Sequence, residues 1–528
     1  MVREDFSGAS FDVVIIGGGI NGCACALDSA TRGYSTLLIE KSDFGSKTSA
    51  ACFKIIHGGL RYLQHLDLKR VIESLNEQKW LRVAAPHLVR PLPFLIPTYS
   101  DFKRSKFFLG AGLLLYRLID FRRNCKLDGA ERLPNSKILS KAETLKIAPH
   151  IQQEGLTGSV VYYDCQVAHC ERLTWLVAKT ASQHGAKTAN YTELKSVEQE
   201  GSKIKSLLLK DLVSEREYRV YPKQVVFAAG PWNEMFLSIL GKQNKQEQVY
   251  SKGIQFAVPK LVKDYALAVD SAYKDPEAVV ASGGRKLFIQ PWRDLSLIGT
   301  SDSVSKEKPD NFKISTKELR ELFDEVQQAY PDPRWKFEDI VFAFGGLRPV
   351  SEEANLEQDS QDSKTSRRPM IEDVGENFVV VTGIKYTTFR LLAEQVLNLV
   401  SSKLGRSERS KTKQLKLVGA EMDKSKVLAE VTKQFPSLSN AEDLYHTYGA
   451  ELLKVLEYYN GDSRIAEACF AAKNEACFTV DDIVIRRTSI CQQGLVEQEF
   501  VGRLIDALVK IEFNSREKLE LEARKLHL

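Results

Sequence analysis

The chain has 528 residues, so it exceeds one ordinary domain, and two or three domains with ample cores are expected. Hydrophobic residues make up 43% of it and charged residues 27%, which is typical of a globular protein. The 74 Lys and Arg residues nearly balance the 69 Asp and Glu residues, and this balance argues against a nucleic-acid-binding protein.

The N-terminal stretch Phe11–Glu40 has the order of a dinucleotide-binding βαβ unit. Its parts are a strand, a glycine-rich turn, a helix of small residues, a second strand and a terminal acid: Val13–Ile16, then Gly17, Gly19 and Gly22, then Cys23–Ala30, Thr36–Ile39 and Glu40. NAD and FAD both bind to such a unit. The rest of the chain must therefore distinguish between the two cofactors.

Each residue of this turn has an expected role. Gly17 permits the tight turn, Gly19 lets the backbone approach the pyrophosphate, and Gly22 lets the helix pack against the strand. The N-terminus of the helix faces the phosphates. Glu40, at the end of the second strand, is expected to accept hydrogen bonds from the ribose hydroxyls.

Further elements follow in chain order. His57, Gly58 and Gly59 stand between apolar residues, and paired glycines after a histidine indicate close approach of the backbone to a flat ligand. Hydrophobic periodicity and turn residues predict these elements: helix Leu68–Leu81, strand Gly155–Asp164, helix Glu171–His184, strand Val225–Ala228, hairpin Phe288–Asp302 with its turn at Trp292–Leu295, strand Phe378–Val381 and a helix from Thr387 or Thr388. Ser351–Arg368 reads as a polar surface loop and Ser401–Lys413 as a linker, after which helical periodicity prevails.

The longest apolar run, Phe107–Tyr116, is far shorter than the roughly 20 residues that cross a bilayer. Basic residues flank it on both sides: Lys103, Arg104, Lys106, Arg117, Arg122 and Arg123. Two interpretations stay open, a segment that lies on an anionic membrane surface and a core helix with solvated ends. The N-terminus shows neither an apolar signal core nor an Arg-rich transit pattern.

Taken together, these stretches resemble FAD-dependent glycerol-3-phosphate dehydrogenase, the family that also contains α-glycerophosphate oxidase. The matching segments are GGGINGCACALDSATRG, KIIHGGLRYLQ, AAGPW, FIQPWRDLSLIGTSD, GGLRPV, KYTTFRLLAE and DDIVIRRT, the last covering Asp481–Thr488. The resemblance implies an α/β fold with a glutathione-reductase-like FAD-binding domain, a mixed-sheet substrate domain and a C-terminal all-helical domain. We expect the FAD-binding domain within residues 1–405, interleaved with substrate parts at roughly 95–155 and 240–340, and the helical domain at 406–528.

The resemblance also implies a reaction, the oxidation of sn-glycerol 3-phosphate to dihydroxyacetone phosphate with hydride transfer to FAD and electron transfer to a quinone. It assigns catalytic roles to four residues and places two others beside the substrate: His57, Arg61, Arg348 and Lys385, with Tyr62 and Thr387 near them. It assigns FAD contacts to Gly17, Gly19, Gly22, Glu40, Thr48, Gly58 and Gly59. The arginines and Lys385 suit a phosphate, which needs cations.

Two positions depart from the family pattern. Ile384 stands where the family usually has glycine, and its side chain is expected to crowd the flavin or change the turn. Gln255 stands where relatives often carry a histidine, so His57 is the more suitable base. The alternative for His57 is a contact to flavin or backbone alone.

Other functions remain open from the sequence. They are an α-glycerophosphate oxidase that uses oxygen, a flavoprotein oxidase of a 2-hydroxy acid or amino acid, and a flavin-binding scaffold without turnover. No metal cluster, Ser/His/Asp triad or P-loop is visible, and the nine cysteines form no C-x-x-C pair, which favours a reducing compartment. We expect a cytoplasmic protein bound peripherally to the inner face of a membrane (the mitochondrial inner membrane in a eukaryote), without nucleic-acid partners. A homodimer stays open.

Overall fold

The computed structural model describes residues 4–63, 67–121, 123–125, 127, 129–242, 248–274, 284–349, 369–383 and 385–526. Contacts divide the chain into two compact units. The first unit consists of Met1–Ala50, His169–Gln248 and Arg367–Leu528. The second consists of Ala51–Ala168 and Val249–Ser366. The predicted Ser351–Arg368 loop and Ile384 lie outside the described residues.

The first unit is built on an eight-stranded sheet. Its main path runs β17 (Met370–Gly375), β18 (Phe378–Thr382), β10 (Glu217–Phe227), β1 (Ser10–Ile16), β2 (Thr36–Ile39) and β7 (Lys187–Ala189). All neighbours on this path are parallel except the antiparallel edge pair β17 and β18. The first residues of β10, Glu217 to Val220, pair instead with β9 (Lys203–Asp211), which pairs with β8 (Thr192–Glu200).

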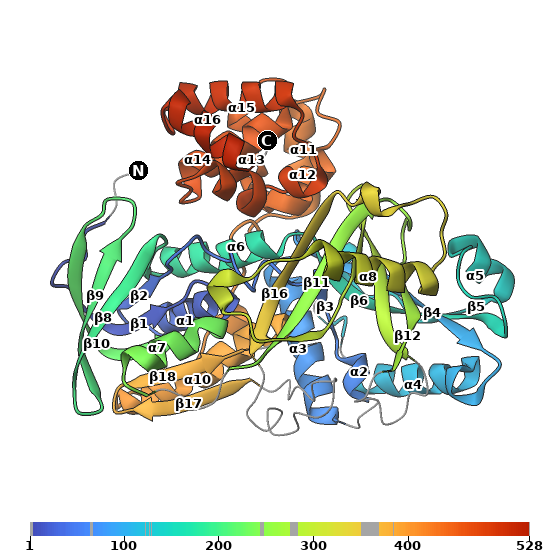
Figure 1. Ribbon diagram of the computed structural model, residues 1–528, viewed down its shortest axis with the longest axis horizontal. Helices are drawn as coiled ribbons and strands as arrows, with labels where there is room; N and C mark the ends of the chain where they lie inside the picture. Colours follow the sequence, from blue (N-terminus) through green and yellow to red (C-terminus); the bar gives the residue numbers. More distant parts are fainter. Residues whose placement is uncertain are drawn as a thin grey trace. The chain divides into compact units, whose positions relative to one another are not determined.

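Helices cover this sheet, as Figure 1 shows. Helix α1 (Ile20–Thr31) packs against both α6 (Cys170–Gln183) and α10 (Phe389–Lys403), and α7 (Asn233–Ile239) contacts β18. The apolar run of β1 is buried on both faces, which is typical of a central parallel strand. The segment after α10 is anchored, because Arg32 at the end of α1 donates to the carbonyl oxygen of Glu408 at 2.7 Å.

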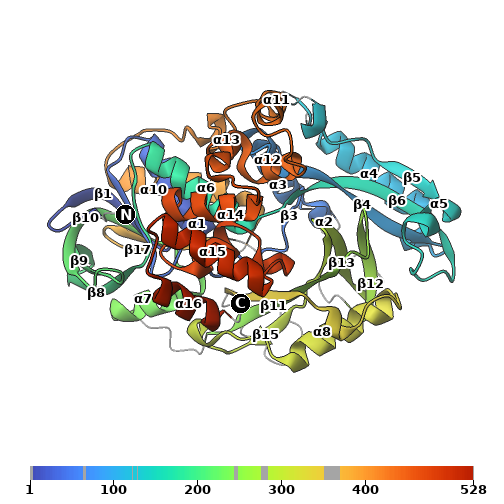
Figure 2. The ribbon, with the colours of Figure 1, turned by 90° about the horizontal axis from the view of Figure 1, so that it is seen from above.

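The C-terminal part of the first unit is helical (Figure 2). Between residues 406 and 526, all of which are described, the structure contains no strand. The helices are α11 (Lys424–Gln434), α12 (Ala441–Tyr448), α13 (Leu452–Val455), α14 (Ser463–Asn474), α15 (Gln498–Lys510) and α16 (Arg516–Lys525). A π-helical turn, Asp482–Arg487, falls on the DDIVIRRT segment. Two apolar clusters form the cores of this region, one beside α14 to α16 and one beside α11 to α13.

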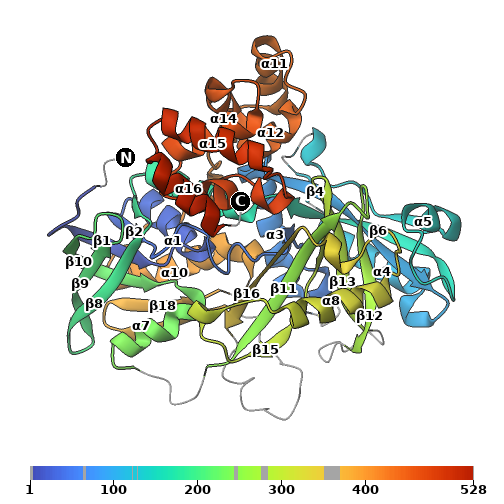
Figure 3. The ribbon, with the colours of Figure 1, turned by 45° about the horizontal axis from the view of Figure 1, so that its top comes forward.

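The second unit has a ten-stranded mixed sheet, part of which can be followed in Figure 3. Its path is β15 (Ser303–Ser305), β11 (Tyr250–Pro259), β14 (Leu295–Gly299), β13 (Gly284–Trp292), β12 (Ala266–Lys274), β4 (Val89–Tyr99), β6 (Leu156–Val167) and β3 (Ile55–Ile56). Strand β16 (Phe342–Pro349) pairs with β11, and β5 (Lys137–Ser140) pairs with β6. The β4–β12 pair is parallel, while the other pairs are antiparallel.

Helices of the second unit are α2 (Leu60–Leu63), α3 (Leu68–Ala84), α4 (Lys106–Ile119), α5 (Lys141–Ile147) and α8 (Thr316–Ala329). Helix α8 begins with a capping box between Ser315 and Glu318. Its apolar face packs on the sheet, where Phe323 meets Trp335 with ring centroids 4.7 Å apart. The sheet and α8 together enclose the main core of this unit.

The predicted fold class is confirmed. The hairpin turn is also where the sequence predicted it, because Trp292 in β13 pairs with Leu295 in β14. One boundary differs clearly from the prediction, since β10 begins at Glu217, well before the predicted Val225. The reason is its antiparallel pairing with β9, which the local sequence does not reveal. The domain boundaries stay a prediction.

Candidate functional site

The glycine-rich turn after β1 requires glycine at two of its three positions. Gly17 has φ +110°, and a Cβ there would lie 2.7 Å from the carbonyl oxygen of Ala228. A Cβ on Gly22 would overlap the carbonyl oxygen of Gly17. The absence of side chains therefore lets α1 start directly against β1 and the end of β10, as the sequence predicted for this turn.

Glu40 holds the same turn from the end of β2. Its Oε2 accepts the backbone N–H of Gly18 at 2.6 Å, and its Oε1 accepts that of Ser42 at 2.8 Å. Burial raises the pKa of the Glu40 carboxyl, and these two N–H groups partly offset that effect. Glu40 thus orders the turn itself, a role that adds to the expected contact with a ribose.

The turn fits a dinucleotide. At Gly19, a Cβ would meet only the Ser49 Oγ, at 3.1 Å, so the backbone is open on that side. The first turn of α1 carries no acidic residue, which suits an anion. Two buried polar atoms nearby, Asn21 Oδ1 and Ser46 Oγ, have no hydrogen-bond partner among the described residues. Unfilled acceptors and donors of this kind are what a bound polar cofactor satisfies.

The turn between β18 and α10 lies against the first turn of α1. A Cβ on Gly383 would overlap the Asn21 amide, so the backbone here is in close contact with α1. Tyr386 anchors the turn, because its hydroxyl donates to the carbonyl oxygen of Cys170 at 2.7 Å. Thr387 is buried and Lys385 is half-buried with extended backbone. Since β1, β10 and β18 are parallel, the turns that follow them share one edge of the sheet.

In the second unit, the His57-Gly58-Gly59 turn follows β3 and is held by a buried carboxylate. Asp164 Oδ1 accepts the Gly58 N–H at 2.7 Å and the Gln78 Nε2–H at 2.8 Å. Gln78 also donates to the carbonyl oxygen of Ile56 at 2.8 Å. A Cβ on Gly58 would overlap the Tyr116 hydroxyl, and Gly59 has φ +89°. Both glycines are therefore required by the packing of this unit itself.

The same carboxylate faces the histidine. His57 Nδ1 lies 3.6 Å from Asp164 Oδ2, with the His57 side chain 46% exposed and that of Asp164 only 2% exposed. A half-exposed imidazole whose inner nitrogen faces a buried carboxylate is a suitable arrangement for a general base. Sequence analysis did not identify Asp164 or Gln78, because each is a single polar residue in an otherwise ordinary strand or helix.

Arg348 lies on β16 opposite Ser251 of β11. Its Nη2 is 3.5 Å from Asp302 Oδ1, and its side chain is 30% exposed. Gly253 leaves room for this guanidinium, because a Cβ there would be 3.0 Å from Nη2. The arginine is thus supported by an acid while part of it stays open to solvent.

Gln255, also on β11, is buried, and its Nε2 donates to the carbonyl oxygen of Ala51 at 2.5 Å. The side chain ties β11 to the segment that leads to His57. Tyr62 lies on α2, whereas the side chain of Arg61 falls outside the described part of the chain. The candidate residues are thus distributed over both units: Gly17, Gly19, Gly22, Glu40, Thr48, Lys385 and Thr387 in the first, and His57, Gly58, Gly59, Arg61, Tyr62 and Arg348 in the second.

Comparison with known proteins decides the family. Residues 12–395 match the family model described as FAD dependent oxidoreductase. The chain belongs to this family. Residues 410–510 match the model described as C-terminal domain of alpha-glycerophosphate oxidase. This FAD-dependent oxidoreductase therefore carries the cofactor for which the turn after β1 is shaped.

Relatives of this oxidoreductase cover most of its length. It is 31% identical to a probable mitochondrial glycerol-3-phosphate dehydrogenase of Dictyostelium discoideum, over 91% of this chain and 77% of the relative. It is 30% identical to a glycerol-3-phosphate dehydrogenase of Synechocystis, over 92% of this chain and 90% of the relative. Its fold is that of the FAD complex of the Bacillus halodurans glycerol-3-phosphate dehydrogenase, with TM-score 0.76, 22% identity and coverage of 99% of this chain and 95% of that one.

Proposed function

We propose that the protein oxidises sn-glycerol 3-phosphate to dihydroxyacetone phosphate and passes the electrons from reduced FAD to a quinone. The observation that carries the proposal is the match of residues 410–510 to the C-terminal domain of α-glycerophosphate oxidase, beyond the oxidoreductase region that ends at residue 395. A flavoprotein oxidase of a 2-hydroxy acid or amino acid would not account for that domain. The names of the relatives over nine-tenths of the chain support the same substrate.

In this proposal His57 takes the hydroxyl proton of the substrate. Its Nδ1 faces Asp164, so the carboxylate stabilises the imidazolium that forms and leaves Nε2 directed away from it. Bound FAD supplies the hydride acceptor. The substrate phosphate is assigned to Arg61, Arg348 and Lys385, because a dianion needs several cations with planar or mobile donors. Tyr62 and Thr387 are assigned to the substrate as neighbours of these groups.

The cofactor contacts are proposed to be Gly17, Gly19, Gly22, Glu40, Thr48, Gly58 and Gly59. We also propose a domain division into an FAD-binding domain within 1–405, substrate parts at roughly 95–155 and 240–340, and a helical domain at 406–528. The described segments of those substrate parts fall almost wholly within the second unit, which supports a separate substrate domain, while residues 406–528 belong to the first unit.

Anaerobic reduction of the bound flavin tests the substrate. The yellow protein should bleach with glycerol 3-phosphate and much less with glycerol, which lacks the phosphate. Bleaching with glycine or a 2-hydroxy acid instead would favour the alternative oxidases. A yellow protein that none of these compounds bleaches would be a flavin-binding scaffold, and the proposal would be wrong.

The exposed face of α4 supports a membrane quinone as the electron acceptor. Within α4 only Leu113 and Tyr116 are buried, so the interpretation as a buried core helix does not hold for most of its apolar residues. The exposed apolar side chains on and beside the helix are Phe102, Phe107, Leu114, Leu115, Leu118 and Phe121. Lys103, Arg104 and Arg117 lie among them. An apolar helix face bordered by cations suits an anionic lipid surface, where quinones are within reach. No helix among the described residues is long and apolar enough to span a bilayer.

Vesicle flotation tests this surface. The protein should float with vesicles that contain anionic lipid, and the double variant Leu114→Ser/Leu118→Ser should float less. Leu521→Ser on α16 is a matched control, because Leu521 is 53% exposed but lies in the first unit. If α4 variants change only the oligomeric state, the face is a dimer contact. If the protein does not float and makes hydrogen peroxide as fast as it reduces a quinone, oxygen is the acceptor.

A further inference from the structure

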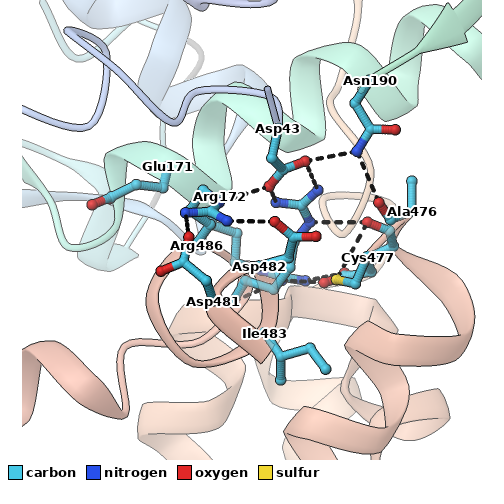
Figure 4. A network of polar contacts seen from close by, with 12 residues as sticks. Asp43, Glu171, Arg172, Asn190, Ala476, Cys477, Asp481, Asp482, Ile483 and Arg486 are labelled. Carbon is cyan, nitrogen blue, oxygen red and sulfur yellow. Dashed lines mark hydrogen bonds and ion pairs between the residues drawn. The ribbon is translucent and has the colours of Figure 1, made fainter. Parts of the chain in front are cut away.

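The DDIVIRRT segment contributes to a buried charge cluster that none of the proposed catalytic steps uses. Figure 4 shows this cluster, in which Asp43, Asn190 and residues of the π-helical turn converge. Arg487 donates to both oxygens of Asp43, at 2.7 and 2.8 Å, and Arg486 Nε donates to Asp43 Oδ2 at 3.0 Å. The side chains of Arg487 and Asp43 have no solvent exposure. Two guanidinium groups of the C-terminal helices thus hold one carboxylate of the loop after β2.

Other contacts complete the cluster within the first unit. Asn190 Nδ2 donates to Asp43 Oδ1 and to the carbonyl oxygen of Ala476, both at 2.9 Å. Arg486 also pairs with Asp481 and Asp482. The pKa of Asp482 is lowered, because its pairing with Arg486 outweighs the opposing effect of burial. The carboxylates and guanidinium groups of the cluster are therefore paired with one another and hydrogen-bonded, which is the condition under which buried ions are tolerated.

Asp43 lies between residues that hold the flavin-binding turn. Three positions earlier, Glu40 accepts the N–H of Gly18 at 2.6 Å. Two positions later, the N–H of Gly45 donates to the carbonyl oxygen of Gly18 at 2.9 Å. The residues on either side of Asp43 thus bond both the N–H and the carbonyl oxygen of Gly18, the residue in the middle of the glycine-rich turn. A displacement of Asp43 would move both of these contacts.

Aromatic packing links the arginine to the same turn by a second route. The Arg487 guanidinium lies 4.5 Å from the centroid of the Trp175 ring. Trp175 stacks on Phe44 with centroids 6.0 Å apart and planes 28° apart. The Phe44 ring in turn covers Gly18, since a Cβ there would lie 2.6 Å from Phe44 Cδ1. Arg487 therefore reaches the turn by two routes, one through Asp43 and its loop and one through Trp175 and Phe44.

We propose that Arg487, together with Arg486, is a positioning residue for the flavin-binding turn, and that through Asp43 it ties retention of FAD to the docking of the C-terminal helices. Charged groups suit this role better than apolar ones, because a bidentate ion pair fixes direction and register. The coupling is reciprocal. If docked helices increase the affinity for FAD, bound FAD must stabilise the docked helices by the same free energy.

The release rate of FAD tests the proposal in the holoenzyme. Asp43→Asn keeps the shape of the side chain and removes its charge, and we expect FAD to dissociate about tenfold faster, within the usual range of coupling between sites. Arg487→Met should act similarly, and the double variant should lose no more than either single one, because both remove the same link. Arg487→Lys keeps the charge without the fork and should give an intermediate rate.

Glu475→Gln is the matched control. Glu475 forms an equally buried bidentate pair with Arg172 of α6, at 3.0 and 3.1 Å. Arg172 also donates to the backbone carbonyl oxygen of Arg487 at 3.4 Å, so this pair borders the cluster, but Asp43 is held by the guanidinium groups of Arg486 and Arg487 and not by Arg172. Glu475→Gln should lower the melting temperature as Asp43→Asn does and leave FAD release unchanged. If Asp43→Asn and Glu475→Gln accelerate release equally, or neither does, the cluster only fastens the helices and the proposal is wrong. If Asp43→Asn does not fold, the rate in Arg487→Lys decides.

Hydrogen exchange gives a second readout that a merely structural pair would not affect. In the wild-type protein, amides of Phe478–Arg487 should exchange more slowly with FAD bound than after FAD has been removed. In Asp43→Asn this difference should disappear, while it should persist in Glu475→Gln. An equal difference in all three proteins would contradict the coupling.

Discussion

Replacement of Asp164 by asparagine separates the two tasks of this carboxylate. Asp164 Oδ1 accepts from Gly58 and Gln78, and Oδ2 faces His57 Nδ1 at 3.6 Å. Asparagine can keep its oxygen towards Gly58 and Gln78, so the turn should stay in place. Its amide group would then face His57 and donate to Nδ1. A neutral His57 in that state carries its proton on Nε2, the atom that should receive the substrate proton.

The expected loss follows from this geometry. A general base contributes about 10²–10⁴-fold to a rate. The corresponding change in a hydrogen-bonded Ser-His-Asp triad costs about 10⁴-fold. Here the pair is separated by 3.6 Å and His57 is 46% exposed, so water can replace part of the interaction. We therefore expect flavin reduction to slow by about 10- to 100-fold, at or below the lower limit of that range.

Anaerobic stopped-flow reduction by glycerol 3-phosphate measures this rate, with FAD content as a check on the fold. Asp332→Asn is a matched control, because Asp332 is also fully buried in the second unit and also lies 3.6 Å from a histidine nitrogen, that of His150. It should leave the rate unchanged. In a His57→Ala background, Asp164→Asn should have no further effect. A rate within twofold of wild type, or an equal loss in the His57→Ala background, would refute the reasoning.

Three further predictions follow from single positions. Gly22→Ala should abolish FAD binding, measured as flavin released by acid, because its Cβ would overlap the Gly17 carbonyl, whereas Gly502→Ala on α15 meets no atom within 4 Å and should keep the cofactor. Arg348→Ala should raise the glycerol 3-phosphate concentration needed for half-maximal flavin reduction roughly tenfold or more with FAD content intact, whereas Arg320→Ala, which removes a 48% exposed arginine of the same unit, should not. Burial raises the pKa of Asp120 from 3.8 to about 7, so the folded state holds this proton more tightly than the unfolded state. The contribution of this proton to the free energy of unfolding is therefore fully present below about pH 4 and is lost as the pH rises to about 7. Asp120→Asn should therefore become progressively more stable than wild type between pH 5 and 8, with a difference in the free energy of unfolding of up to roughly 3–4 kcal/mol and a correspondingly higher melting temperature. A difference that stays constant with pH would contradict the assignment.

The parts of the fold that the sequence revealed depend on neighbours in the chain. The β1–α1–β2 unit could be predicted because its strand, glycines, helix and acid fall within Phe11–Glu40, and each has a local physical signature. The hairpin of β13 and β14 could be predicted for the same reason, since its two strands are joined by a short turn. Amphipathic helices such as α3 follow from periodicity alone. The early start of β10 was missed because it depends on pairing with β9.

The residues that sequence analysis missed act over long distances in the chain. Asp164 reaches Gly58 across 106 positions, and Arg487 reaches Asp43 across 444. No local pattern distinguishes such a residue from an ordinary buried or surface charge. The DDIVIRRT segment matched the family, yet its partner could not be inferred, because nothing near Asp43 in the sequence marks it as the end of an ion pair. Long-range polar contacts therefore require the structure.

Gln255 and Asp164 together support the proposal that proton transfer takes place at His57. Relatives in the family that the sequence resembles often carry a histidine at the position of Gln255, and a glutamine amide cannot accept a proton at neutral pH. Gln255 is instead buried, and its Nε2 donates to the carbonyl oxygen of Ala51. That bond holds the segment that precedes β3 and the His57 turn. Asp164 holds the residue that follows His57, because it accepts the N–H of Gly58. Glutamine in place of histidine at position 255 thus removes one titratable side chain, while the Gln255 amide still supports the segment that leads to His57. His57 has two features that a base needs, a carboxylate at one ring nitrogen and solvent exposure of the ring.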